Sequence, residues 1–208
     1  MSSTVPRPRT RKAPAERAAE IAAAATAVAR EQGLSALTLR AVAERAGITS
    51  GLVAHYQPSM DDLVARVYTD LVEEEVRDVE RVVEAAPDAP ARLGALIDTL
   101  MDGARDELTV VWVEGWAMAR RSDPLALAVR GQMQRWQSLV EGIVAEGCRT
   151  GAFSTAEPGE VAWELIGMID GLNAQSLARG TDTTRFARRT ARAAEALVGA
   201  RPGTIPVH

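Results

Sequence analysis

Apolar residues in this 208-residue chain recur every three or four positions, and no stretch sustains the period of two that marks a β-strand. In the first such segment, Ile21, Ala25, Val28 and Ala29 share one helical face. Alanine supplies much of the 47% apolar content, aromatic residues make up 4%, and alanine favours helices over strands. The sequence therefore predicts an all-α fold.

Caps and breakers divide the chain into about nine helices. Thr38 and Ser59 each precede a periodic segment that they can cap, and Gly33 and Gly47 stand where helices should end. The predicted helices span about 14–32, 39–46, 50–56, 60–84, 91–105, 108–121, 123–149, 160–178 and 182–198.

Charge separates two parts of the chain. Residues 1–58 hold eight basic and four acidic side chains, whereas residues 59–208 hold 16 basic and 24 acidic ones. A basic module on an acidic body favours anion binding at the N-terminus, and the alternative is a basic tail of no consequence. We expect a disordered basic arm at 1–13, an N-terminal domain at 14–58, a helical body at 59–200 and a disordered tail at 201–208.

Cys148 is the single cysteine, which excludes an internal disulfide and multi-cysteine metal sites and suggests a reducing compartment. The longest mostly apolar runs, 21–29 and 108–113, are far shorter than the roughly 18 residues that a membrane span needs. The N-terminus lacks the apolar segment of a secretory signal. We expect a soluble, cytoplasmic protein with no membrane partner.

Three residues, Gly47-Ile48-Thr49, join the two short helices predicted at 39–46 and 50–56. Such a pair, with a glycine in its short turn, is the signature of a helix-turn-helix. We expect Ile48 and Leu52 to pack beneath the turn, so that the second helix presents small and polar side chains to a DNA major groove about 12 Å wide. The alternative on spacing alone is an ordinary helical hairpin.

Residues 14–64 resemble the N-terminal DNA-binding domain of the TetR (tetracycline-repressor) family. The resemblance lies in the segment AAATAVAREQGLSALTLRAVAERAGITSGLVAHYQPSMDDLV, where Gly33 to Thr38 fit the GxxxxT stretch of that family. Three positions depart from the family pattern: Ala54 replaces a tyrosine, Gln57 a phenylalanine and Met60 a lysine. That lysine contacts a phosphate in family members, so one backbone contact is expected to be missing here.

The pair His55-Tyr56 resembles the HYF of the choline-responsive, betaine-pathway subgroup, as do WVEGWAMARRSDP and AWELIGMIDGL in the C-terminal half. This second resemblance does not transfer the ligand. The family implies an N-terminal three-helix DNA-binding domain and a C-terminal ligand-binding and dimerisation domain. It also implies a homodimeric repressor that a small-molecule effector releases from an inverted repeat in double-stranded DNA.

The resemblance implies DNA contacts at seven positions. Phosphate contacts are expected from Thr38, Thr49 and Tyr56, a phosphate or guanine contact from Arg40, and base-edge contacts from Ser50, Gly51 and His55. The alternative for Thr38 is a helix cap alone, and for His55 a structural role. Arg7, Arg9, Arg11 and Lys12 either follow the minor groove or add nonspecific attraction.

Tryptophan, methionine and polar residues on otherwise apolar helices predict a ligand pocket in the body. Trp112 and Trp116 are four residues apart and therefore share a helix face. Carboxylates beside tryptophans would suit a cationic ligand, and the alternative is that the Trp and Met residues are plain core. The pocket candidates are Trp112, Glu114, Trp116, Met133, Trp136, Trp163, Met168, Asp170 and Asn173.

The last two helices are candidates for a dimer interface. The segment 160–178 is apolar nearly all round, so it needs cover on more than one side, and the segment 182–198 offers small residues for close packing. The predicted interface residues are Phe186, Ala187, Ala191, Ala194, Leu197 and Val198.

No enzyme chemistry is indicated. The two histidines, His55 and His208, lie in the candidate reading helix and at the chain end, and no nucleophile–base pair, phosphate loop or metal-ligand cluster is present. We expect no catalytic residue, metal or cofactor. The other class of function left open is a helical protein–protein adaptor that keeps the fold without binding DNA.

Overall fold

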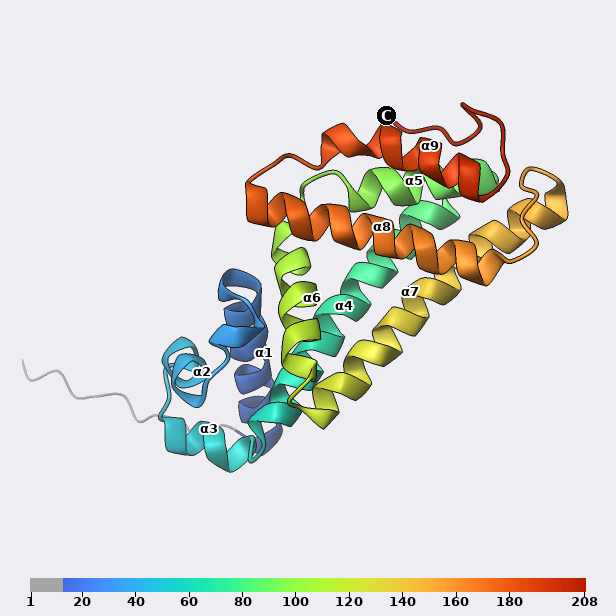
Figure 1. Ribbon diagram of the computed structural model, residues 1–208. Coiled ribbons are helices and arrows are strands. Elements are labelled where there is room, and N and C mark those ends of the chain that lie inside the picture. Colours follow the sequence, from blue (N-terminus) through green and yellow to red (C-terminus); the bar gives the residue numbers. More distant parts are fainter. Residues whose placement is uncertain (1–12) are drawn as a thin grey trace, which may run out of the picture.

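The computed structural model describes residues 13–208, and within this range it contains nine α-helices, two short 3₁₀ helices and no strand (Figure 1). The predicted basic arm, except Ala13, lies outside the described residues. The α-helices are α1 (Pro14–Gln32), α2 (Leu39–Ala46), α3 (Ser50–Tyr56), α4 (Met60–Glu84), α5 (Ala89–Leu100), α6 (Asp106–Ala119), α7 (Asp123–Thr150), α8 (Pro158–Arg179) and α9 (Ala187–Leu197). The all-α prediction is confirmed.

Local capping explains where the helices begin and end. The Thr38 and Ser59 hydroxyls accept hydrogen bonds from the backbone N–H of Ala41 and Asp62, at 3.1 Å each. Gly47 closes α2 in the left-handed conformation, with φ of +65°. These caps confirm the predicted ends of the helices that build the N-terminal domain.

Helices α1 to α3 form a small domain at one end of the molecule, and α4 runs from it diagonally into the body (Figure 1). In the body α4 packs against α7 and α5, while α6 packs against both α7 and α8. Helix α6 also contacts α1 and the 3₁₀ turn η1 (Leu34–Ala36). The two domains are therefore joined by α4 along the chain and by α6 through space.

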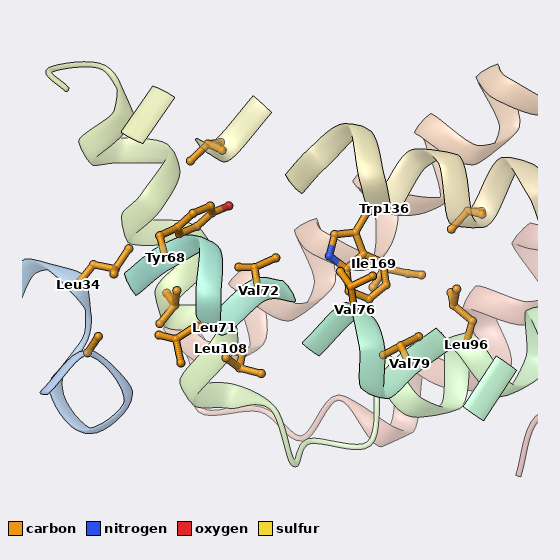
Figure 2. Close-up of a cluster of buried hydrophobic side chains, with 14 of the residues drawn as sticks. Leu34, Tyr68, Leu71, Val72, Val76, Val79, Leu96, Leu108, Trp136 and Ile169 are labelled. Carbon is orange, nitrogen blue, oxygen red and sulfur yellow. The ribbon is translucent and has the colours of Figure 1, made fainter. Parts of the chain in front are cut away.

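One hydrophobic core runs through both domains. Figure 2 shows Leu34 of the N-terminal domain close to Tyr68 and Leu71 of α4, with Val76 and Trp136 farther into the body. Because α4 contributes buried side chains from Leu63 to Val83, the same helix stabilises both domains.

Two predicted helix boundaries were wrong. Helix α5 ends at Leu100 rather than 105, and the segment predicted as helix from residue 182 forms the 3₁₀ turn η2 (Thr184–Phe186) before α9 begins. The chain bends at both places because the side chain of Asp102 accepts a hydrogen bond from the N–H of Ala104, and that of Asp182 one from the N–H of Thr184.

The predicted disordered tail was also wrong. Residues 201–208 fold back over α9 and α5, Ile205 is buried, and its N–H donates to the Glu195 carboxylate at 3.0 Å. A Cβ atom at Gly94 of α5 would lie 1.9 Å from the Pro206 carbonyl oxygen, so the glycine lets the tail approach the α5 backbone.

Replacing Ile205 by alanine should lower the free energy of unfolding by about 2 kcal/mol, because the tail would lose its buried anchor. Urea unfolding followed by circular dichroism measures the effect. Val82→Ala on the exposed side of α4 is the matched control and should change stability by less than about 0.5 kcal/mol. Equal stability of Ile205→Ala and wild type would contradict the packing of the tail.

Candidate functional site

The first candidate site is the outer face of α2 and α3. The Ile48 N–H donates to the Ala43 carbonyl at 3.0 Å, which ends α2 sharply, and the Thr49 hydroxyl caps α3 by accepting from the N–H of Leu52. Val53 rather than Leu52 is the fully buried anchor of α3, which corrects the prediction for Leu52. The helices therefore adopt the helix-turn-helix arrangement.

The side chains expected to contact DNA lie mainly on the solvent side of this unit. Ser50, Gly51 and His55 of α3 are exposed, as is Thr49 at its start. Arg40 is exposed, and its guanidinium lies 3.0 Å from the Glu44 carboxylate. Tyr56 is half-buried, with its ring edge-on to that of His55. Thr38 is exposed. The Thr38 oxygen accepts the α2 cap, so its hydroxyl can still donate to a phosphate.

Two of the family departures have a structural role. The Gln57 side chain accepts a hydrogen bond from Arg66, which ties the end of α3 to α4. Met60 is half-buried and packs against the hydrophobic core. Gln57 therefore joins the end of α3 to α4, and Met60 anchors the start of α4 in the core.

The second candidate site is a cavity of about 50 Å³ in the body. It lies between α4, the α5–α6 connection, α6, α7 and α8. Its lining residues are Glu75, Leu100, Arg105, Thr109, Trp112, Val113, Trp116, Met133, Trp136, Ile166, Ile169, Asp170 and Asn173.

Tryptophan rings from two helices form the aromatic part of the cavity. The ring centroids of Trp112 and Trp116 on α6 are 5.9 Å apart, and Trp136 on α7 is 6% exposed. Tyr68 of α4 is not part of the cavity lining. It packs edge-on against Trp112, with ring centroids 5.5 Å apart, and so holds that ring in place. Such electron-rich ring faces attract cations.

Two carboxyl groups stand beside the rings. Glu75 is 5% exposed and accepts a hydrogen bond from the indole N–H of Trp112 at 3.0 Å. Burial raises the pKa of Glu75, against the lowering effect of the Trp112 hydrogen bond and the Arg105 charge. Burial and the nearby Glu75 charge raise the pKa of Asp170 to about 7. A buried cation would stabilise both carboxylates in the charged form.

Three predicted pocket residues lie elsewhere. Trp163 is 64% exposed, Met168 is half-buried outside the cavity lining, and Glu114 points to the N-terminal domain. Glu114 is two residues from both Trp112 and Trp116, so it stands about 200° around α6 from each and cannot share their face. The sequence analysis did not identify Glu75 and Arg105 as cavity residues. Glu75 lies in the charged second half of α4 and Arg105 lies in a turn, and neither segment shows polar residues on an otherwise apolar helix.

Glu114 instead connects the body to the N-terminal domain. Its carboxylate accepts hydrogen bonds from the Ser35 hydroxyl at 2.6 Å and from the Ser35 N–H at 3.0 Å. A Cβ atom at Gly33, whose φ is +87°, would lie 2.5 Å from the same carboxylate. Helix α6 therefore carries the pocket on one face and the contact to the N-terminal domain on the other.

The predicted dimer residues are largely internal. Ala187, Ala191, Ala194 and Val198 are buried within the single chain, where α9 packs on α5. These four side chains have almost no surface left for a partner, so the prediction was wrong for them. Phe186 and Leu197 are half-buried.

Among residues 13–208, no cluster of His, Cys, Asp and Glu could hold a metal ion, and no helix is long and apolar enough to cross a membrane.

Comparison with known proteins defines the class. Residues 21–67 match the model of bacterial regulatory proteins of the tetR family, and residues 90–199 match the model of the BetI-type transcriptional repressor C-terminal domain. The chain belongs to the TetR family, and its C-terminal domain is of the BetI type. It is a DNA-binding transcriptional regulator and not an enzyme.

A sequence relative agrees with this assignment, and two solved structures share the fold. The HTH-type transcriptional regulator BetI of Burkholderia thailandensis is 32% identical over 165 residues, which cover 77% of this chain and 82% of that protein. The structure of a putative transcriptional regulator from Saccharomonospora viridis in complex with choline has a TM-score of 0.74 at 18% identity, covering 89% and 96% of the two chains. The structure of FadR from Bacillus subtilis in complex with stearoyl-CoA has a TM-score of 0.68 at 18% identity, covering 88% and 98%.

The raised pKa of Asp170 predicts a pH-dependent stability. An unfolded aspartate has a pKa near 4, so between about pH 4 and pH 7 the unfolded chain loses a proton that folded Asp170 retains. The contribution of Asp170 to stability is therefore complete below pH 4 and is lost as the pH rises through 7. Asp170→Asn should raise the melting temperature at pH 8 relative to wild type and leave it nearly unchanged at pH 4. The exposed Asp123→Asn is the control. A lower melting temperature of Asp170→Asn at pH 8 would contradict the burial of this charge.

Proposed function

We propose that this regulator is a homodimeric repressor, released from an inverted-repeat operator when a small quaternary ammonium cation enters the cavity between α6, α7 and α8. The observation that carries the ligand class is the pairing of three tryptophans with the buried carboxyl group of Glu75 and the half-buried one of Asp170. A quaternary ammonium cannot donate hydrogen bonds, so ring faces and diffuse negative charge are the groups that bind it best. The choline complex of the Saccharomonospora viridis regulator supports this ligand class.

The exposed face of α3 is the proposed reading surface for DNA bases. His55 and Ser50 supply hydrogen-bonding groups, and Gly51 leaves room for the groove edge. Two such surfaces about one helical turn apart would read an inverted repeat, which requires a dimer. Cytoplasmic location follows from this role, because the operator is there.

The outer side of α8 is the proposed dimer surface. Trp163 is exposed, and a Cβ atom at Gly167 or Gly171 would meet nothing within 4 Å. Trp163, Gly167 and Gly171 are spaced four residues apart and therefore lie on one face of α8. Because the two glycines have no side chains, a second copy of α8 can approach this face closely. Phe186 and Leu197 are the residues of the predicted interface that keep exposed surface for such a contact.

Operator binding tests the proposed DNA surface. Arg40→Ala and His55→Ala should each weaken binding by about 1–3 kcal/mol, because each removes a contact to a base edge or phosphate. Fluorescence anisotropy with labelled fragments from the neighbouring genes, at several salt concentrations, measures the loss. The melting temperature and the sedimentation coefficient of the dimer should stay at wild-type values. If no fragment binds wild type, a helical adaptor becomes the better description; if both variants bind as wild type does, another face contacts DNA.

The Glu114–Ser35 contact is the proposed route from the cavity to the DNA-binding domain. Movement of α6 around a ligand would displace Glu114, which holds the Ser35 turn before α2. Replacing Glu114 by alanine should leave choline affinity unchanged and reduce the loss of operator affinity that saturating choline causes, a coupling typically worth 1–3 kcal/mol. Calorimetric choline titrations with and without operator measure this coupling. Asp106→Ala, an exposed substitution in the first turn of the same helix, is the matched control. Unchanged coupling in Glu114→Ala would exclude this route.

A further inference from the structure

The cavity contains a cationic group that a simple cation site does not need. Arg105 lies in the connection between α5 and α6 and lines the cavity. Its Nε–H donates to the Thr99 carbonyl at 3.2 Å, which holds the guanidinium group at this end of the site. The side chain is half-buried, so its charge is only partly screened by water.

Arg105 forms no ion pair within 4.0 Å among residues 13–208. Its charge acts on Glu75 and lowers the pKa of that carboxyl, but the Glu75 carboxylate is hydrogen-bonded to Trp112 instead. The terminal N–H groups of the guanidinium therefore have no carboxylate partner in the described part of the chain. Two parallel N–H donors are the arrangement that binds a carboxylate in bidentate fashion.

Charge is therefore ordered along the cavity. Arg105 is the N-cap of α6, whereas Trp112 and Trp116 follow about two and three turns later on that helix. Glu75 and Asp170 stand beside the tryptophans. One end of the cavity thus favours an anion, and the other end favours a cation.

The aromatic wall also holds unused donors. The indole N–H groups of Trp116 and Trp136 are buried and have no hydrogen-bond partner among the described residues. Buried donors without a partner are uncommon and costly, so they mark this wall as a ligand site rather than plain core.

We propose that the preferred effector is a small zwitterion, a quaternary ammonium that also carries a carboxylate, and that Arg105 is the residue that selects it over an alcohol. The inference rests on the proposed function, since the ammonium end would occupy the tryptophan and carboxylate end of the cavity. The carboxylate end would then reach Arg105. A quaternary ammonium alcohol such as choline fills the first part and leaves Arg105 unpaired.

Four probes test this assignment by isothermal titration calorimetry on the full-length dimer. Trimethylglycine and 4-(trimethylammonio)butanoate are zwitterions of different length, and choline and tetramethylammonium lack the carboxylate. Wild type should bind at least one zwitterion roughly tenfold or more tighter than choline, as expected for a charge-assisted contact. Arg105→Gln should remove that preference and keep choline affinity within about threefold. Arg105→Lys keeps the charge without the two parallel donors and should retain part of the preference.

Arg130→Gln, an exposed substitution on α7, is the matched control and should change neither affinity. The selectivity of wild type is informative even if an Arg105 variant folds poorly, which its melting temperature would reveal. Choline binding as tightly as both zwitterions to wild type would overturn the assignment of Arg105 and leave the proposed function intact. Failure of all four probes to bind wild type would overturn the proposed ligand class and this inference together.

Discussion

The contact between Tyr68 and Gly115 joins α4 to α6 between the cavity and the N-terminal domain. Tyr68 is fully buried on α4, and a Cβ atom at position 115 would lie 2.7 Å from its ring. The absence of a side chain at Gly115 therefore sets the distance between α4 and α6. Because Trp112 packs on the same tyrosine and Glu114 is the next residue before the glycine, the cavity wall and the contact to Ser35 both depend on this close approach.

Burial of acidic groups in the same region costs free energy, and a bound cation would offset that cost. Glu75 and Asp170 are acidic groups that burial has pushed toward the neutral form, and the Tyr68 hydroxyl near them has no hydrogen-bond partner in the described structure. Burial and the neighbouring Asp170 and Glu75 charges raise the pKa of Tyr68. A core selected for stability alone would contain apolar residues at these positions. Their presence beside an aromatic wall supports a binding role for the cavity.

Features that depend on neighbouring residues could be predicted from the sequence, and features that depend on distant packing could not. The caps at Thr38 and Ser59 and the turn at Gly47 are local, so the helix-turn-helix followed from spacing and side-chain chemistry. Trp163 lies seven residues, about 10 Å, nearer the start of α8 than Asp170, where its side chain is exposed and outside the cavity. The tail was missed because its order depends on Gly94, more than a hundred residues away in sequence.

Helix α4 is uninterrupted over its 25 residues and therefore about 37 Å long. Its near end follows α3, and Glu75, its residue in the cavity wall, lies about 22 Å from that end. A rotation of about 9° around Glu75 would move the near end by about 3.5 Å, close to the 3.4 Å rise of one base pair. A ligand that tilts α4 through this angle would thus shift each recognition helix of a dimer relative to its half-site by about one base pair.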